Sequence, residues 1–314
     1  VGGLVMDWSP GCYLPKLYGM ECDCQTFLRF RVRYTVHYCM QKELKIISFN
    51  VGLTRLKFTP FNYNFVPFVT DRVRLLPESL RAEDADIVCL QEVFEGGLFK
   101  KLRAELKAVY PYAYHDNKGW KLFNKGLAVF SKHRFEHVGE IGFKTIGVEK
   151  FAQKGASVIR VIEGVYAGLV LANVHFPYGG YVGHSPAFAP ITALRDKAIE
   201  HLHQALEKFG HLVIMAGDFN FGPAIAYQNY EYLLSLGYKN LTGEEVTWDP
   251  ENTMNKLFTL MKPQSVDHIF ANTNLFKKIH RFKNQVLFKE SLTTRSGRVL
   301  NLSDHYGVVA TLSY

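Results

Sequence analysis

The stretch LVIMAGDFN, residues 212–220, decides how the rest of the chain is interpreted. Five apolar residues lead through a glycine into Asp218, Phe219 and Asn220, a pattern typical of a buried strand. Burying a carboxylate or an amide is costly unless it has a partner, so these groups should face something polar. Alternation along a strand places Asp218 and Asn220 on one face and Phe219 on the other.

From residue 43 onward, short apolar strands alternate with amphipathic helices. Strands are predicted at 44–51, 86–93, 126–132, 156–163, 166–176, 212–220, 266–272, 286–292 and 306–312. Helices are predicted at 69–82, 97–110, 190–209 and 224–236. We expect Gly164 and Val165 to connect a hairpin, and Pro77 to kink or divide the first helix. The mixture predicts an α/β fold with two sheets packed face to face and outer helices.

The first 39 residues differ from the rest of the chain. They hold Cys12, Cys22, Cys24 and Cys39, without a metal-ligand spacing and without a signal-peptide pattern. Met40 directly precedes the first clear strand. We therefore expect residues 1–39 to be a segment of doubtful order outside the native domain, and residues 40–314 to form one folded domain.

Composition excludes some classes of protein and leaves others open. The longest uncharged apolar stretch, 164–174, is too short for the roughly 20 residues of a membrane-spanning helix. A soluble monomer is expected, intracellular by default, with export by a route without an N-terminal signal left open. The net charge of +8 suits nucleic acid, phospholipid or a phosphorylated small molecule without choosing among them. The densest basic cluster, 277–283, is interpreted as a solvated face.

Polar side chains stand at the ends of several predicted strands. They are Asn50, Glu92, Asn173, His175, Asp218, Asn220, Asp267, Asp304 and His305. Each alone has an ordinary explanation, because Asp and Asn are common in turns and a single His is usually structural. Ligands of α/β proteins bind at sheet ends, so the shared placement predicts one site.

The residue types in this set favour one kind of chemistry. Carboxylate and amide oxygens suit Mg²⁺ or Mn²⁺. The sequence has no HExxH, no clustered Cys and His, and no GxSxG, which argues against zinc hydrolases and serine nucleophiles. A divalent ion, a histidine base and amide donors together suit hydrolysis of a phosphate ester.

Six short motifs carry a family resemblance. SFN, LQE, NVH, GDFN, VDHIF and SDH stand in the order found in the Mg²⁺-dependent endonuclease/exonuclease/phosphatase superfamily. The chain resembles that superfamily over about residues 44–312. The resemblance implies a four-layer α/β sandwich and a metal-dependent phosphoric ester hydrolase.

The resemblance also implies roles for the metal and the proton transfer. Glu92 resembles the main metal ligand, with Asn50 beside it and Asp304 supporting the metal site. His305 resembles the general base that activates water for in-line attack on phosphorus. Asp267 resembles the carboxylate that orients this histidine and stabilises its protonated form.

Further residues are implied to bind the substrate. Asp218 and Asn220 match the pair that binds the phosphoryl group and the attacking water, and Asp218 is also expected to assist the leaving group. His175 resembles the histidine that hydrogen-bonds a phosphate oxygen. Asn173, in the same motif, is assigned to substrate binding.

One segment bears on the branch of the superfamily. TWDPEN, 247–252, and SDHY, 303–306, resemble the neutral sphingomyelinase-like branch, although Gly307 replaces the proline usual there. The resemblance implies a phosphodiesterase of lipid metabolism that acts on a phospholipid head group. An alternative interpretation of TWDPEN is a simple turn, because Asp-Pro and Asn are turn formers.

Three other functions remain open. An endonuclease of the deoxyribonuclease type suits the positive charge, but no basic stripe interleaved with aromatics is visible. An inositol phosphate phosphatase is disfavoured, because QSVDHIF replaces the Trp-Cys-Asp-Arg string of that branch. A non-catalytic binding protein is disfavoured, because every expected site position holds a competent residue.

Two aromatic segments follow strands that end in site residues. They cover 57–68 and 176–190, and the second contains Tyr178 and Tyr181. We predict that these two tyrosines bind substrate and that the segments contact a membrane surface or a choline-like head group. Packing of each segment under its own side chains is the alternative.

Overall fold

The computed structural model describes residues 43–58, 61–64, 66–116, 124–146, 149, 153–178, 189–256 and 261–314. The chain divides into two units, and the described residues all belong to the second, Gln41–Tyr314. The expectations for residues 1–39 and for Tyr181 concern residues outside the described ranges.

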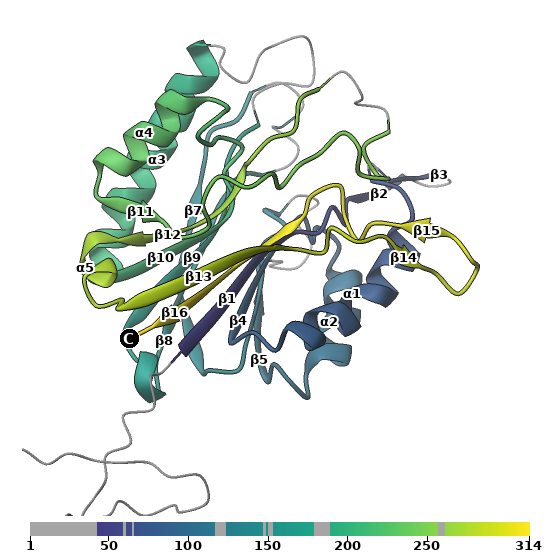
Figure 1. The fold of residues 1–314 in the computed structure, drawn as a ribbon, viewed down its shortest axis with the longest axis horizontal. Coiled ribbons are helices and arrows are strands. Elements are labelled where there is room, and N and C mark those ends of the chain that lie inside the picture. The colour runs from purple at the N-terminus through teal and green to yellow at the C-terminus, as the bar shows by residue number, and fades with distance from the viewer. Residues whose placement is uncertain are drawn as a thin grey trace, which may run out of the picture. The chain divides into compact units, whose positions relative to one another are not determined.

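Two six-stranded mixed sheets form the centre of the fold (Figure 1). The first sheet has the order β13 (Arg281–Leu287), β16 (Gly307–Ser313), β1 (Glu43–Asn50), β4 (Ile87–Gln91), β6 (Ala128–Ser131) and β5 (Tyr112–His115). The second has the order β11 (Tyr238–Asn240), β12 (Asp267–Asn272), β10 (Leu212–Asp218), β9 (Leu169–His175), β8 (Gly155–Val161) and β7 (Phe135–Gly142). In each sheet one central pair, β1 with β4 and β9 with β10, is parallel.

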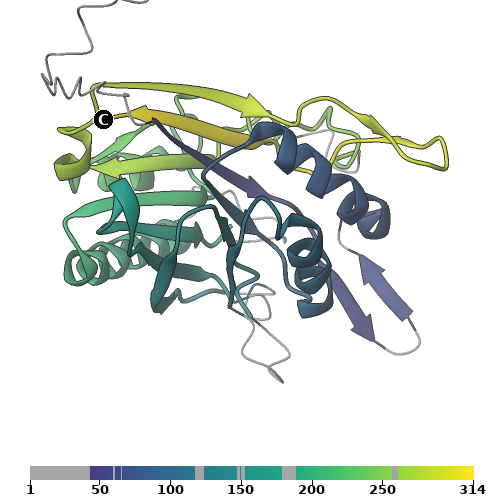
Figure 2. The same ribbon diagram turned by 90° about the horizontal axis from the view of Figure 1, so that it is seen from below.

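Helices cover the outer face of each sheet (Figures 1 and 2). The first sheet carries α1 (Val69–Glu83) and α2 (Gly96–Leu106), and the second carries α3 (Ala189–Phe209) and α4 (Tyr227–Ser235). The remaining elements are short: β2 (Arg55–Phe58), β3 (Phe61–Asn64), η3 (Gly164–Tyr166), α5 (Thr273–Phe276), β14 (Leu292–Thr293) and β15 (Val299–Leu300). The predicted α/β sandwich of two packed mixed sheets with outer helices is confirmed.

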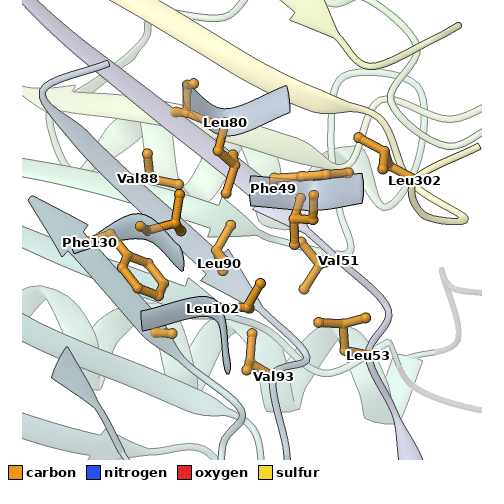
Figure 3. Packing of buried hydrophobic residues seen from close by; sticks show 14 of the residues in the cluster. Phe49, Val51, Leu53, Leu80, Val88, Leu90, Val93, Leu102, Phe130 and Leu302 are labelled. Carbon is orange, nitrogen blue, oxygen red and sulfur yellow. The ribbon is translucent and has the colours of Figure 1, made fainter. Parts of the chain in front are cut away.

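Three hydrophobic cores lie between the four layers. One joins the first sheet to α1 and α2, and Figure 3 shows Phe49 and Leu90 of the sheet meeting Leu80 and Leu102 of the helices. A second joins the second sheet to α3 and α4. The third fills the space between the sheets.

Alternation along the strands decides which side chains reach the space between the sheets. In β10, Val213 and Met215 belong to the outer core, whereas Ile214 and Ala216 belong to the inner one. Asp218 continues the inner series, because successive side chains of a strand point to opposite faces. In β1 the same rule places Asn50, after Leu44 and Ile46, on the inner face.

Local predictions were confirmed in the core and less accurate at the edges. The predicted hairpin is formed by β8 and β9, which pair antiparallel. Its connection is longer than the predicted Gly164 and Val165, because residues 162–168, with η3 among them, join the two strands. The strand predicted at 286–292 is wrong in position, because β13 spans Arg281–Leu287. Its first five residues are exposed at the sheet edge and so carry no apolar pattern.

For helix α1, the predicted division at Pro77 is wrong. α1 is one 15-residue helix with Pro77 inside it, and the alternative of a kink stays a prediction. Leu76, Pro77 and Leu80 are all buried, so packing maintains the helix across the proline. Among the described residues, no helix combines the length and the apolar character that a membrane span requires.

Candidate active site

The polar strand ends of both sheets meet at one end of the sandwich. Asn50, His175 and Asp218 end β1, β9 and β10, and Glu92 follows β4 directly. Asp267 begins β12 and His305 precedes β16, and these two strands run antiparallel to their central neighbours. Because of these directions, the starts of β12 and β16 lie beside the carboxyl ends of the parallel strands.

On the side of the first sheet, the site has an acidic group of residues, with Glu92 as its carboxylate and Asn50 beside it. The Asn50 amide donates to Asp218 Oδ2 at 3.0 Å and approaches Glu92 Oε1 at 3.4 Å. Thr54 Oγ1, which the sequence did not indicate, donates to Glu92 Oε2 at 2.8 Å. Glu92 has a left-handed backbone (φ 62°), a conformation that is sparse for glutamate and common at functional sites.

His305 and Asp267 form a buried pair. His305 Nδ1 lies 2.8 Å from Asp267 Oδ2, and His305 Nε2 faces Asp218 Oδ2 at 3.9 Å. Burial lowers the pKa of His305, but the attraction of Asp267 and Asp218 outweighs burial and raises this pKa well above its usual value. Burial raises the pKa of Asp267 to about 6, against the attraction of His305. We place the shared proton on Nδ1, because imidazole is the more basic group.

A cationic group lies on the side of the second sheet. His175 Nε2 lies 3.2 Å from Asp218 Oδ2. Lys154 is buried, contacts the His175 ring, and has its Nζ 4.0 Å from Glu149 Oε1. The sequence prediction missed Lys154 and Glu149. The only sequence signal was a lysine immediately before the small residues that begin β8.

Asp218 stands between the two groups. Burial alone raises its pKa, but the hydrogen bond from His175 and the charges of His175, His305 and Lys154 outweigh burial and lower it. Asp218 is therefore a carboxylate at neutral pH. Asp218 lies between the cationic residues His175 and Lys154 on one side and the acidic residue Glu92 on the other. In that position its carboxylate can orient a water molecule by accepting a hydrogen bond from it.

The strand alternation predicted for Asn220 does not extend that far. β10 ends at Asp218, and Asn220 has a left-handed backbone (φ 53°), which asparagine tolerates better than most residues. Its backbone N–H donates to Asp218 Oδ1 at 2.9 Å, and its side-chain amide donates to the Phe176 carbonyl at 2.9 Å. Phe219 packs in the outer core, as the alternation predicts.

Asn173 lies between the two sheets, deeper in the sandwich than the strand ends where the substrate is expected to bind. Its amide donates to the Leu90 and Ala128 carbonyls at 2.9 Å each, and its oxygen accepts from Gln91 Nε2 at 2.7 Å. These partners belong to the first sheet, so Asn173 joins the two sheets inside the sandwich. Its contacts give no support for a substrate-binding role.

The predicted role of the tyrosines is untested. The Tyr178 side chain is partly buried, its backbone N–H donates to Glu149 Oε1, and burial raises its pKa. Tyr181 lies outside the described residues. Substrate binding by either residue therefore stays a prediction.

The TWDPEN segment and the residues just after it support the loop that carries His305. Asn252 Nδ2 donates to the Ser303 carbonyl at 2.9 Å, and Asn255 Nδ2 donates to the Asp304 carbonyl at 2.8 Å. Trp248 forms an isolated β-bridge with His305. The segment is more than a surface turn, because it holds the backbone on which the candidate base is carried.

The donor set fits a hard divalent cation. Asp218, Asp267 and His305 have ligand atoms that all lie within 4.8 Å of one another. The carboxylates of Glu92 and Asp218 also converge on the Asn50 amide, as described above. Such oxygen-rich groups suit Mg²⁺ or Mn²⁺, and they could hold a cation on either side of Asp218.

Comparison with known proteins places the chain in a family. The profile of the Endonuclease/Exonuclease/phosphatase family matches residues 47–305. The chain belongs to this family. The match confirms the resemblance carried by the six motifs, and the family places the chain among phosphoric ester hydrolases.

Relatives that the chain is similar to include sphingomyelinases and a phospholipase C. Sphingomyelinase C of Listeria ivanovii is 22% identical over 94% of this chain and 96% of its own length. Human sphingomyelin phosphodiesterase 2 is 26% identical over 54% of this chain. The match spans only 42% of the human protein. Inositol phosphosphingolipids phospholipase C of Schizosaccharomyces pombe is 28% identical over 79% of this chain and 57% of that protein.

Solved structures of the family share the fold. The crystal structure of SmcL superposes with a TM-score of 0.70 and 20% identity over 87% of this chain and 99% of that one. A magnesium-bound beta toxin mutant from Staphylococcus aureus gives a TM-score of 0.70 and 22% identity over 87% of this chain and 100% of that one. At these identities the superpositions show the fold alone.

Proposed function

We propose that the protein is a Mg²⁺-dependent phosphodiesterase that hydrolyses the ester between the phosphate and the lipid backbone of a phospholipid and releases the phosphorylated head group, as a sphingomyelinase or phospholipase C does. The observation that carries the proposal is the division of the site into an acidic group and a cationic group, with the His305–Asp267 pair beside them. The similarity to sphingomyelinases supports the choice of a phospholipid.

In this proposal Glu92, Asn50 and Asp304 hold the metal ion. When bound, Mg²⁺ polarises a phosphoryl oxygen and offsets the negative charge that develops on it. The cluster of Asp218, Asp267 and His305 is less suitable, because His305 would lose its role as a base if it bound the ion. Mn²⁺ has similar ligand preferences and is expected to replace Mg²⁺.

His305 is proposed as the general base. Its Nδ1–H donates to Asp267, which leaves Nε2 to take a proton from the attacking water. Asp267 holds the ring in this tautomer and stabilises the imidazolium that forms. Asp218 accepts a hydrogen bond from the other O–H of the water, which keeps that proton, and Asn220 holds Asp218 through its backbone N–H. The P–O bond opposite the attacking water breaks, and the departing alkoxide takes up a proton from solvent.

Lys154 and His175 are proposed to bind the phosphoryl oxygens. Both are buried, and donors in a site that excludes water stabilise developing negative charge more strongly than exposed ones. We further propose that the segments after β1 and β9 contact the lipid surface, and that the protein acts as a monomer.

A substrate panel tests this proposal. Sphingomyelin vesicles, plasmid DNA, abasic DNA and inositol phosphates are each incubated with the protein and Mg²⁺ or EDTA. We expect release of a phosphorylated head group from the vesicles in Mg²⁺ alone, and loss of this activity in Asp218→Asn. Cleavage of DNA, or phosphate release from inositol phosphates, in place of head-group release would identify one of the alternatives.

A further inference from the structure

Helix α1 carries a buried cation that has no place in the chemistry described so far. The Arg72 side chain is fully buried, and each of its five N–H groups donates to a backbone carbonyl. The acceptors are the carbonyls of Val51, Gly52, Val66, Pro67 and Leu302, at distances of 2.6, 2.7, 3.3, 2.9 and 3.0 Å.

Two of these carbonyls belong to the segment that follows Asn50, one of the proposed metal ligands. Val51 and Gly52 come directly after Asn50, and the Gly52 N–H donates to Asn50 Oδ1 at 3.1 Å. Gly52 has a φ of 52°, and a Cβ there would lie 2.6 Å from Asp304 Oδ1. The position of this loop therefore determines where Asn50 and Asp304 stand.

Another carbonyl belongs to the segment that leads to the base. Leu302 comes three residues before His305, and the next two carbonyls are bound by Asn252 and Asn255. Three successive carbonyls before His305 are thus held by buried side chains. Arg72 is the member of this set that also holds the loop after Asn50.

The energetics argue against a role in packing alone. Within the described residues, no carboxylate forms a salt bridge with Arg72. Burying a cation in such a setting is costly, and an apolar side chain would fill the same volume at a lower cost. Removing the guanidinium would also take a donor away from five carbonyls, four of which it meets in buried hydrogen bonds. Burial lowers the pKa of Arg72 to about 10 while Asp304 and Glu92 oppose this, so the group is charged at neutral pH.

We propose that Arg72 is a positioning residue that holds the metal-side loop after Asn50 and the base-side loop before His305 in a fixed relation. It acts through the backbone and touches neither substrate nor metal. The inference rests on the proposed function, which assigns Asn50 to the metal ion and His305 to proton transfer.

The test compares Arg72→Lys with Arg74→Lys, a change at an exposed arginine of the same helix. Calorimetry measures Mn²⁺ binding, and steady-state kinetics on bis(p-nitrophenyl) phosphate give kcat and KM. For Arg72→Lys we expect about 10–100-fold weaker Mn²⁺ binding together with a lower kcat and a nearly unchanged KM. Asn252→Ala loosens the segment that carries both Asp304 and His305 but leaves the loop after Asn50 in place, so it should lower kcat with a smaller loss of Mn²⁺ affinity than Arg72→Lys.

Hydrogen exchange separates this inference from the proposed function. In Arg72→Lys without metal or substrate, amide exchange should rise in both 50–54 and 302–306. Exchange and Mn²⁺ binding equal to those of Arg74→Lys would overturn the inference, even if the wild-type protein is an active phosphodiesterase. If the wild-type protein neither binds Mn²⁺ nor hydrolyses any ester, the proposed function fails, and the exchange result still decides the role of Arg72.

A second variant applies if Arg72→Lys does not fold. Gly52→Ala disturbs the same loop without changing the Arg72 side chain, because the added Cβ would lie 2.6 Å from Asp304 Oδ1. It should reproduce the paired loss of Mn²⁺ affinity and kcat. A Gly52→Ala protein with wild-type values of both would overturn the inference.

Discussion

The two strand–loop–helix units that flank the site, β1 to α1 and β9 to α3, share a plan but carry opposite charge. In each unit a central strand ends in a polar residue, and a buried arginine of the following helix binds carbonyls of the intervening segment. Arg195 of α3 donates to the Pro177 and Tyr178 carbonyls at 2.8 and 2.6 Å, as Arg72 does in its own unit. The strand of one unit ends in Asn50 beside Glu92, and that of the other ends in His175 beside Lys154.

This difference shows how one backbone arrangement can serve two tasks. A phosphate ester and a divalent cation carry opposite charges, so a site that holds both needs an anionic side and a cationic side. Sheet geometry supplies two equivalent positions facing each other, and a few side chains decide the sign of each. Asp218 and His305 stand where the two sides meet.

Removing the His305 side chain, which stands where the two sides meet, should have the largest effect on activity. We expect His305→Ala to lower kcat by roughly 10²–10⁴-fold, because the attacking water loses its base. Initial rates on a soluble phosphodiester measure the loss, and circular dichroism checks the fold. A rate within twofold of wild type would show that His305 does not act as the base.

The two sides should then respond differently to single changes. Lys154→Met should lower kcat by roughly 10²–10³-fold without changing the Mn²⁺ concentration that gives half-maximal activity, because a phosphoryl donor is lost. Glu92→Gln should instead raise that Mn²⁺ concentration. Titration of Mn²⁺ against activity measures both, with Lys144→Met as an exposed-lysine control. Equal Mn²⁺ requirements in the two variants would remove the proposed division of the site.

The pH dependence of activity tests the His305–Asp267 pair, which lies between the anionic and the cationic side of the site. His305 must be neutral to accept a proton, so activity should rise with pH as His305 loses its proton. The Asp267 charge raises the pKa of His305, so Asp267→Asn should lower this pKa and move the acid limb of kcat/KM by about 1–3 pH units toward lower pH. The plateau rate should fall as well, because the ring is held less firmly. If the acid limb does not move in Asp267→Asn, the titration of His305 is not its cause.

The smallest effect on activity is expected where the two sheets are joined. Asn173→Ala should lower the free energy of unfolding by about 1–3 kcal/mol, because Gln91 and two carbonyls lose a buried partner. KM should stay unchanged. Urea unfolding and steady-state kinetics measure the two effects, with exposed Asn274→Ala as the control. A raised KM at unchanged stability would support the substrate-binding role predicted from the sequence.

The sequence was informative where the two-residue period of a strand and the position of a residue at the strand end indicate the same site. Strand alternation predicts the face of Asp218, and the strand end predicts its place at the rim, so both could be predicted without the structure. The same signal selected Asn173, two residues before His175 on the same face of β9. A period of two gives the face of a strand but not the depth along it, so it could not separate a site residue from a link between sheets.

Other contributors gave little or no such signal. Lys154 and Glu149 come before β8 in a segment without apolar periodicity. Arg72 did leave a trace, because it lies among Val69, Val73 and Leu76 on the apolar face of α1. A charged residue in the middle of an apolar helix face is a signal for a buried cation, whereas its partners, being backbone carbonyls, have no identity in the sequence.

The left-handed backbone at Glu92 bears on how the protein could evolve in the laboratory. This conformation costs on the order of 1–2 kcal/mol for a residue other than glycine. A library sorted only for resistance to proteolysis should therefore replace Glu92 with glycine, while a library sorted for turnover should retain it. The first kind of selection would yield a sturdier protein without the proposed metal ligand, suited to capturing an uncleaved substrate for crystallography.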